Sequence, residues 1–246
     1  MLDVFFLSYN EPYADENYAK LRELVPNARR VNGVKGFAAA HQECARRSFT
    51  NNFYVVDSDA IIVEGFDFKF TPSKHNKWWG EAESNCICVW SSINPINDLI
   101  YGHGGVKILP KQPLLGTDKD VIDFTTGFGL NTKVFNEVSN ITAFNYDEFN
   151  TFRSSFRECA KLASNLTNKE IQNKIDSEEL KKIQKEAEHR LQVWTSMGEE
   201  NKFGKYCIAG AVQGKQYGLK FTGDSVNLKL INDYDWMKNE FDRFFR

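Results

Sequence analysis

The stretch Asn52-Phe53-Tyr54-Val55-Val56-Asp57-Ser58-Asp59 joins a strongly strand-forming run to two carboxylates spaced two residues apart. Aromatic and β-branched residues favour an extended and buried backbone. Side chains at positions i and i+2 of a strand leave it on the same side. The stretch therefore predicts a buried strand that delivers Asp57 and Asp59 together to its carboxyl end.

The residues before this strand predict an alternation of strands and helices. The apolar runs predict strands at 3–8 and 29–31, and the helical spacing of apolar residues predicts helices at 14–24 and 37–48. This order implies a parallel sheet with right-handed crossovers. Ligands of such sheets bind beyond the carboxyl ends of the strands, and Asn10, Glu11 and the two aspartates all fall at that edge.

The rest of the chain is less regular. We expect a strand at 85–90, a glycine-rich loop at 101–107, a strand and turn at 123–129, helices at 151–163 and 177–195, a strand-like glycine-rich piece at 204–219, and a final helix at 233–244. The fold class predicted is α/β: a Rossmann-like, mixed but mostly parallel sheet with helices on both faces, plus a helical C-terminal half. The expected organisation is an α/β core over residues 1–150 with a mainly helical part, 151–246, packed on it as one compact unit.

Composition excludes several classes of function. The 31 lysines and arginines oppose 33 aspartates and glutamates, which gives a formal net charge of −2. This balance argues against a general polyanion binder, although a local basic patch stays open. No apolar run reaches the length of a membrane span, and the start of the chain lacks the basic segment of a signal peptide. We therefore expect a cytoplasmic protein with no membrane partner.

The Asp57/Asp59 pair is the sharpest chemical signal. Two carboxylates at a ligand-binding sheet edge can share one hard divalent cation, Mn²⁺ or Mg²⁺, whose open positions are filled by diphosphate oxygens. The cation would neutralise charge on a leaving diphosphate. The alternative is a surface turn, where aspartate is common for local hydrogen-bonding reasons.

Two further segments carry candidate residues. In the 101–107 segment, Gly104 and Gly105 would let a phosphate approach the backbone, His103 is a candidate metal ligand, and Lys107 supplies a cation; a simple tight turn is the alternative. Farther along, Arg153 and Arg157 lie one helical turn apart as an anion clamp.

Two other features have a functional and a structural interpretation. Glu158 is a candidate general base, with a salt-bridge role as the alternative. Trp78 and Trp79, beside Lys74 and Lys77, form either a patch for stacking and phosphate binding or part of the core.

The run Gly33-Val-Lys-Gly-Phe-Ala-Ala-Ala40, followed by a strand that ends in Asp57-Ser58-Asp59, resembles the nucleotide-sugar half of GT-A glycosyltransferases. In that superfamily an Asp-x-Asp motif binds manganese and the sugar diphosphate. The resemblance implies that the nucleotide sugar contacts the following residues: Ser8, Tyr9, Asn10, Glu11, Lys35, Gly36, Asp57 and Ser58. It implies a metal held by Asp57 and Asp59.

A second resemblance extends over most of the chain. The runs 53–59, 89–97, 101–107 and 231–236 are similar to glycosyltransferase-like proteins encoded by tailed bacteriophages. Such enzymes decorate hydroxymethylated pyrimidines in phage DNA with glucose or arabinose. The resemblance implies a modified DNA acceptor and a location in the host cytoplasm. We expect a nucleoside diphosphate sugar as the donor, with UDP as the favoured carrier.

The resemblance leaves part of the mechanism open. Lys107, Arg153 and Arg157 would bind diphosphate or the DNA backbone. The general base is not fixed, and Glu158 and Asp123 are the two candidates. Alternative functions are transfer to a protein or glycan acceptor, and a non-catalytic nucleotide-binding scaffold.

Overall fold

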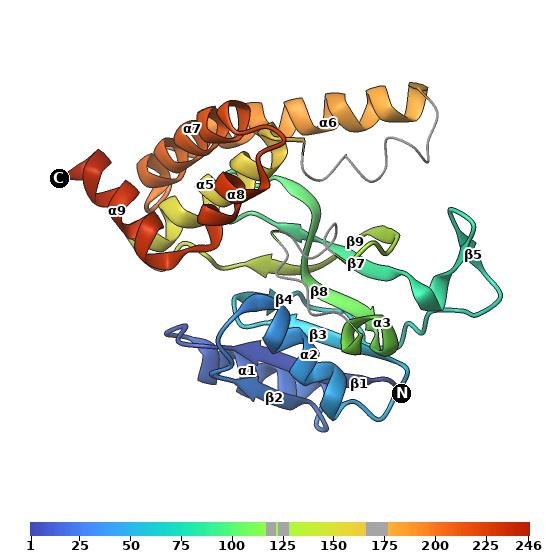
Figure 1. Cartoon of the computed structure of the whole chain (residues 1–246). Coiled ribbons are helices and arrows are strands. Elements are labelled where there is room, and N and C mark those ends of the chain that lie inside the picture. Colours follow the sequence, from blue (N-terminus) through green and yellow to red (C-terminus); the bar gives the residue numbers. More distant parts are fainter. Residues whose placement is uncertain (117–121, 123–127, 166–176) are drawn as a thin grey trace. The chain divides into compact units, whose positions relative to one another are not determined.

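A computed structural model describes residues 1–116, 122, 128–165 and 177–246. The chain divides into two compact units, which are considered separately (Figure 1). The first unit comprises Met1–Asn94 and Ile100–Ala143, and the second comprises Pro95–Leu99 and Phe144–Arg246. The expected boundary between residues 150 and 151 falls inside helix α5 (Glu148–Ala163), whereas the units divide before this helix.

The first unit is built on a seven-stranded sheet in the order β2-β1-β3-β8-β7-β9-β4. Its elements are β1 (Asp3–Ser8), α1 (Ala14–Leu24), β2 (Arg29–Asn32), α2 (Phe37–Arg47), β3 (Asn52–Asp57), β4 (Ala60–Ile62), the hairpin β5 (Lys77–Trp78) and β6 (Glu81–Ala82), the short η1 (Glu83–Asn85), β7 (Ile87–Ile93), β8 (Ile100–Pro110), α3 (Lys111–Leu115) and β9 (Thr132–Thr142). Strands β1, β2, β3, β7 and β9 run in one direction, and β8 and β4 run in the other. The predicted mixed sheet, mostly parallel in direction, is therefore confirmed.

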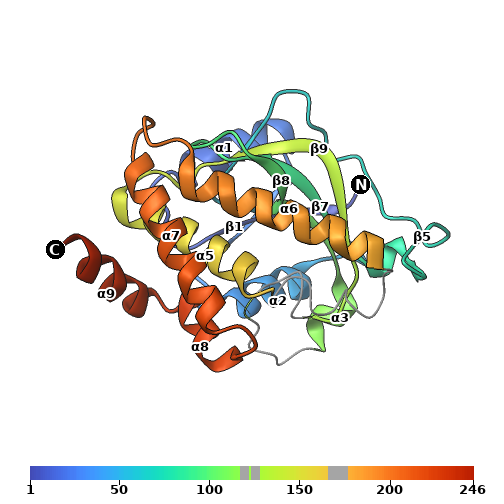
Figure 2. The same cartoon turned by 90° about the horizontal axis from the view of Figure 1, so that it is seen from above.

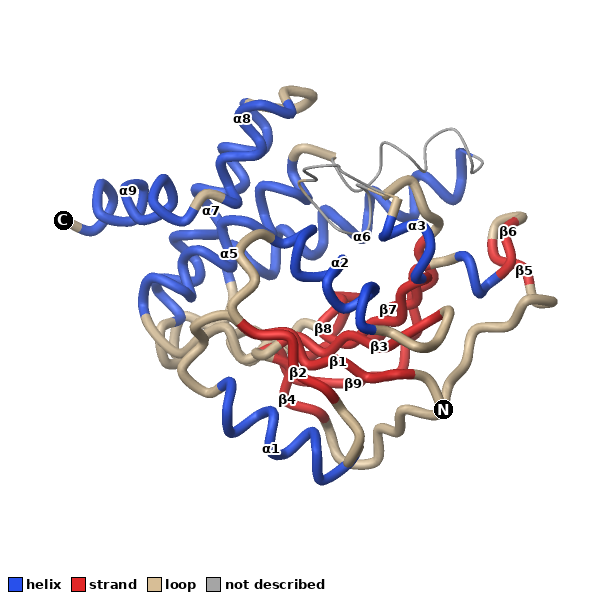
Figure 3. The backbone as a smooth tube through the Cα atoms, turned by 60° about the horizontal axis from the view of Figure 1, so that its bottom comes forward, coloured by secondary structure: helices blue, strands red, loops and turns tan. Residues whose placement is uncertain are grey.

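Helices cover both faces of this sheet, as expected. Alternate residues of β1 point to opposite sides: Val4 and Phe6 pack with Leu21 of α1, whereas Phe5 packs with Cys44 of α2. Figure 3 shows α1 and α2 on opposite sides of the strands. The period-2 alternation of a buried strand thus fixes which helix covers which face.

The connection from β3 to β4 requires the sheet to curl. Only Ser58 and Asp59 separate these strands along the chain, yet β8, β7 and β9 lie between them in the sheet. Four strand spacings in a flat sheet would be about 19 Å, whereas the chain from Asp57 to Ala60 reaches at most about 11 Å. The sheet therefore bends back so that its β4 edge returns toward the end of β3 (Figures 1 and 3).

The predicted glycine-rich loop at 101–107 was wrong, because these residues form part of strand β8. A side chain on Gly102 would lie 2.5 Å from Val134, and one on Gly105 would lie 2.8 Å from the Asn140 amide, both on β9. Gly104, with φ +80°, lies where the pairing of β7 with β8 shifts register. The glycines thus leave room for the curl, a role that their spacing alone does not reveal.

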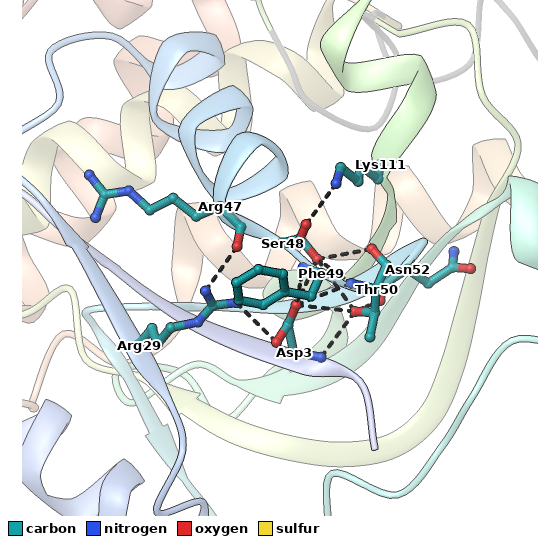
Figure 4. A network of polar contacts seen from close by, with 8 residues as sticks. All are labelled: Asp3, Arg29, Arg47, Ser48, Phe49, Thr50, Asn52 and Lys111. Atoms are coloured by element: carbon teal, nitrogen blue, oxygen red, sulfur yellow. Dashed lines mark hydrogen bonds and ion pairs between the residues drawn. The ribbon is translucent and has the colours of Figure 1, made fainter.

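A closed polar network holds the amino-terminal edge of β1 and β3 (Figure 4). Asp3 Oδ2 accepts hydrogen bonds from Phe49 N at 2.5 Å and Ser48 Oγ at 3.0 Å, and Asp3 Oδ1 pairs with Arg29 at 2.9 Å. Lys111 Nζ donates to Ser48 O at 2.7 Å. Burial alone would raise the pKa of Asp3, but these hydrogen bonds and the Arg29 charge lower it below its usual value. The polar groups at this edge satisfy one another, so the network is structural.

Replacing Asp3 should weaken the first unit in a pH-dependent way. Because the folded-state pKa of Asp3 lies below the unfolded value, its stabilisation is present above about pH 4 and is lost as the pH falls further. We expect Asp3→Asn to lower the free energy of unfolding by about 1–3 kcal/mol at pH 7, measured by urea denaturation. The exposed Asp67→Asn is the matched control and should unfold like the wild type; an equal loss in both variants would contradict the network's role.

The second unit is helical in its described residues. It contains α5, α6 (Ser177–Ser196), α7 (Gly204–Lys220), α8 (Ser225–Lys229), the short η2 (Leu230–Asn232) and α9 (Tyr234–Phe245). Asp233 caps α9 by accepting from Trp236 N at 2.9 Å, which is the usual role of an aspartate just before a helix. Over the described part of the chain, no helix combines the length and apolar composition needed to cross a membrane.

The strand-like piece expected at 204–219 was wrong, because these residues form α7. Gly210, Gly214 and Gly218 recur every four residues and face the α5 backbone, where added side chains would collide with the carbonyl oxygens of Phe152, Phe156 and Ala160. The positions advance together along both helices, so α5 and α7 run in the same direction in close contact (Figure 2). Glycine lowers helix propensity, but here tertiary packing outweighs that cost.

A side chain at Gly214 should separate α7 from α5. In an exposed helix, glycine to alanine stabilises by up to about 1 kcal/mol, whereas overpacking at this contact should make Gly214→Ala destabilising by about 1–3 kcal/mol. Urea denaturation followed by circular dichroism measures the change. The exposed Gln216→Ala on the same helix should change stability by less than about 0.5 kcal/mol; a stabilised Gly214→Ala would contradict the packing described.

Candidate functional site

The candidate site lies in the first unit, where the β3–β4 link meets the ends of other elements. We call Asp57, Ser58 and Asp59 the β3–β4 link, and each of these three residues accepts a hydrogen bond from another part of this unit. Lys107 Nζ on β8 donates to Asp57 Oδ1 at 2.6 Å, Asn17 Nδ2 on α1 donates to Ser58 O at 2.8 Å, and Ala143 N beyond β9 donates to Asp59 O at 2.7 Å. The link is therefore held by β8 at the Asp57 side chain, and by α1 and the end of β9 at its backbone.

Lys107 is a buried cation inside the sheet. Only 4% of the residue is exposed, and its ammonium group also donates to Gly104 O at 2.8 Å. A buried ammonium requires a paired charge and further hydrogen bonds, and Asp57 and Gly104 supply them. Because the ammonium group donates to Asp57, we infer that Lys107 holds that carboxylate in place.

Asp59 has a strongly perturbed carboxyl group. Burial, together with the charges of Asp57 and Glu11, raises the pKa of Asp59 to about 7, and Lys107 only partly opposes this. Near neutral pH the link therefore holds more negative charge than its single buried lysine balances. Such a site favours either a proton or a cation on Asp59.

His41 of α2 lies behind this ion pair. Its ring is 1% exposed, and Nδ1 lies 2.9 Å from Phe37 O, so Nδ1 carries the proton. Burial and the Lys107 charge lower the pKa of His41 to about 4, although Asp57 opposes them. The imidazole is neutral near pH 7, and it contributes packing without adding charge.

The ends of β1 and β2 present the next group of predicted residues. Ser8 Oγ accepts from Arg30 Nε and donates to Asn32 Oδ1, both at 2.8 Å. Tyr9 and Asn10 follow Ser8 and are exposed, and Tyr9 N donates to Glu11 Oε2 at 2.7 Å. The pairing of Leu7 with Asp57 in parallel register puts these residues at the same sheet edge as the aspartates.

Lys35 and Gly36 lie at the entrance to α2. Both are exposed, and Gly36, with φ +97°, directly precedes Phe37, the first residue of the helix. The first backbone N–H groups of a helix are oriented to bind anions. The edge thus combines carboxylates at the β3–β4 link with the N-terminal end of α2.

His103 on β8 reaches the neighbourhood of the link through β9. Its Nδ1 lies 3.5 Å from Thr142 Oγ1, and Thr142 pairs with Ala60, the residue after Asp59. Over residues 1–116, 122, 128–165 and 177–246, no group of three or more His, Cys, Asp or Glu side chains could hold a metal. His103 therefore does not complete a three-ligand set with the aspartates, and the metal prediction rests on Asp57 and Asp59.

A pair of carboxylates fits a cation that is shared with a substrate. Mg²⁺-like ions are commonly held by one or two carboxylates, with waters and substrate phosphates in the remaining positions. Burial first, and then the charges of Asp57 and Glu11, raise the pKa of Asp59, and a divalent cation would stabilise its ionised form. The donor set therefore fits Mn²⁺ or Mg²⁺ in the presence of a diphosphate.

The remaining candidates lie elsewhere. In the second unit, Glu158 pairs with Arg190 at 2.7 Å and Lys161 at 3.2 Å, a geometry that favours the salt-bridge alternative. Arg153 lies over the Tyr234 ring at 5.7 Å, and Arg157 donates to Asn232 Oδ1 at 2.8 Å. Arg153 thus contacts the first residue of α9, and Arg157 contacts the last residue of η2. Asp123 lies outside the described residues.

Sequence reasoning missed Asn17 and His41. Asn17 lies on the apolar face of α1 with Ala14 and Leu21, and His41 is buried on α2 beside Cys44 and Ala45. A polar residue at a core position of an amphipathic helix signals a buried hydrogen-bond partner. That signal gives the burial but not the partner: Asn17 donates to Ser58 O of the β3–β4 link, whereas the His41 ring bonds to Phe37 O of its own helix.

Comparisons with known proteins give little further information. No protein-family model matches the chain, and no curated protein sequence matches it. Among solved structures, the chain is similar to HddC from Yersinia pseudotuberculosis, with 15% identity and a TM-score of 0.32, over 57% of this chain and 70% of that one. A likeness at this level carries no argument about activity, so the candidate site rests on its own geometry.

Removing the charge of Asp59 should stabilise the metal-free protein above neutral pH. Because the pKa of Asp59 is raised to about 7, the folded protein binds the extra proton between about pH 4 and 7 and loses stability as the pH rises through that window. Asp59→Asn should therefore unfold at higher temperature than the wild type at pH 8 in EDTA, by the equivalent of about 1–3 kcal/mol, with the difference vanishing toward pH 4.

The neighbouring aspartate provides the control with the opposite sign. Asp57→Asn leaves the buried Lys107 without its carboxylate partner and should destabilise at pH 8. If both substitutions changed the melting temperature in the same direction, the charge distribution described for the link would be wrong.

Proposed function

We propose that the chain is a metal-dependent glycosyltransferase that uses a nucleoside diphosphate sugar, with UDP as the favoured carrier. The observation that carries the proposal is the β3–β4 link. Its two carboxylates lie at the carboxyl edge of the parallel strands, one is held by a buried lysine, and the other has its pKa raised to about 7. Edges of this kind are where nucleotides bind in α/β sheets.

Each element at this edge has a defined task in the proposal. Asp59 ligates the divalent cation, and Asp57, held by Lys107 at 2.6 Å, contacts ribose or a metal-bound water. Ser8, Tyr9, Asn10 and Glu11 line the nucleoside. Lys35 and the N–H groups that follow Gly36 bind phosphate oxygens. The bound cation neutralises the negative charge that develops on the leaving diphosphate.

The transfer breaks the bond between the anomeric carbon of the sugar and the diphosphate oxygen, and it forms a bond from that carbon to an acceptor hydroxyl oxygen. The hydroxyl proton passes to a general base, and the diphosphate leaves with both bonding electrons. Glu158 is the weaker of the two predicted bases, because its carboxylate is paired with Arg190 and Lys161. Asp123 is therefore the first base to test.

The acceptor proposed is a hydroxymethylated pyrimidine in DNA, with glucose or arabinose as the sugar. The support is the sequence resemblance to phage enzymes that modify their own DNA. A base in duplex DNA would have to leave the stack to reach the sugar carbon. Binding to DNA should weaken steeply with salt, whereas binding to a glycan acceptor should hardly change.

Thermal melting with nucleotide and metal tests the donor site. UDP with Mn²⁺ at about 100 times its dissociation constant should add about 2.7 kcal/mol and raise the melting temperature by several degrees. EDTA should remove most of this shift, and Asp59→Asn should remove it at every pH.

Three results would count against the proposal. The exposed Asp67→Asn keeps the link intact and should melt with the wild-type shift; a lost shift in this variant would mean that the response does not report the link. Absence of a metal-dependent shift in the wild type, with UDP and with the other nucleoside diphosphates, would favour the scaffold alternative. A shift without sugar transfer to any acceptor would do the same.

A further inference from the structure

The β5–β6 hairpin of the first unit ends in an unusual turn. Its two central residues are Trp79 and Gly80, with φ of 48° and 84°. Two successive positive φ angles define the type I′ hairpin turn, which strongly prefers Asn-Gly. A bulky tryptophan in the left-handed region is unfavourable, so local backbone preference does not account for Trp79.

The hairpin has a fixed base beneath this residue. Trp78 is partly buried, and its Nε1 donates to Thr132 O at 3.0 Å. Glu83, just after the hairpin, forms an ion pair with Lys133 and accepts from Ser73 N at 2.8 Å. The hairpin projects away from the seven-stranded sheet of its unit (Figures 1 and 3). It is thus tied to the start of β9 while its tip faces outward.

Trp79 extends this base as a flat surface. Its ring lies 5.6 Å from the Trp78 ring with an interplanar angle of 18°, which is a stacked arrangement, and 39% of Trp79 is exposed. The Trp78 indole is held in place by its hydrogen bond to Thr132 O, and it orients the Trp79 indole stacked on it. The result is a preformed aromatic platform, which loses little conformational freedom when a planar ring stacks on it.

The charge around the platform selects among ligands with flat faces. Lys74, His75 and Lys77 precede Trp78 closely along the chain and are exposed, and Glu81 is the exposed acid of the hairpin. The other nearby acid, Glu83, is buried and neutralised by Lys133. A stacking surface with more lysines than acids suits single-stranded nucleic acid, which carries both flat bases and negative phosphates. The lysines would add little to the binding of a neutral glycan.

We propose that the β5–β6 hairpin binds single-stranded nucleic acid, with one base stacked on Trp79 and the adjoining phosphates near Lys74 and Lys77. The hairpin lies at the start of β7 and β9, at the sheet edge opposite to the β3–β4 link, so this site is separate from the one in the proposed function. Binding at the hairpin does not depend on that function. The platform is sequence-tolerant, because every base has a π face.

The test uses the full chain and a fluorescently labelled 20-nucleotide oligothymidine, with binding measured by anisotropy at several salt concentrations. Trp79→Asn creates the preferred Asn-Gly turn, so the variant should melt at or above the wild-type temperature. Its affinity should nevertheless fall by about 10- to 100-fold, the loss expected from removing one stacked base. A merely structural tryptophan would not give retained stability with lost binding.

Three further variants complete the test. Trp79→Phe keeps a stacking ring and should bind within a few-fold of the wild type, as should the exposed aromatic control Tyr13→Ala. Replacing both Lys74 and Lys77 by glutamine should make the salt dependence shallower by about one to two in the slope of log affinity against log salt.

Three results would overturn the hairpin assignment: no oligonucleotide binding by the wild type, wild-type affinity in Trp79→Asn, or Trp79-dependent binding of a neutral oligosaccharide in place of the oligonucleotide. Asp59→Asn separates this proposal from the donor site, since it should bind the oligonucleotide like the wild type. Oligonucleotide binding through Trp79 without any nucleotide-dependent melting shift would contradict the proposed function but still support the hairpin assignment.

Discussion

The two-residue connection between β3 and β4 is the constraint on which the first unit depends. Because Ser58 and Asp59 must join strands that flank three others in the sheet, the sheet has to curl, and the curl brings the end of β9 to the end of β3. The hydrogen bond from Ala143 N to Asp59 O joins the residue after β9 to the residue before β4. The glycines of β8 and the register shifts of β7 follow from the same requirement, since a curled sheet needs room on its concave side.

The curl also concentrates charge. Asp57, Asp59 and Glu11 act on one another electrostatically, and the buried Lys107 balances only part of their charge. At the opposite edge, Asp3 is surrounded by donors that lower its pKa. The two edges of the same strands thus have opposite character: one satisfies its own polar groups, and the other keeps a carboxyl group whose ionisation costs stability. Strained or unsatisfied charge of this kind is typical of sites that bind a ligand.

The sequence predicted the parts of the fold that local pattern determines. Strand β1, helix α1 and the β3 run were predicted within a residue of their bounds, because their periodicity and end signals lie within a few residues. Asp57 and Asp59 could be singled out for the same reason. The β8 and α7 predictions failed at glycines. Gly105 leaves room for the Asn140 side chain, and Gly214 leaves room for the backbone of Phe156. A glycine that makes room for a distant residue looks the same in sequence as a glycine in a turn, and Asn17 likewise has a partner, Ser58 O, that only the fold supplies.

The central claim is that Asp59 holds a divalent cation that it shares with a nucleoside diphosphate. The most direct measurement is the anomalous difference density of manganese in crystals grown with MnCl₂ and UDP. The account predicts one peak at bonding distance, about 2.0–2.2 Å, from an Asp59 carboxylate oxygen, with diphosphate oxygens on its other side. Ordered UDP at the sheet edge without manganese at Asp59, or manganese bound only elsewhere, would contradict it.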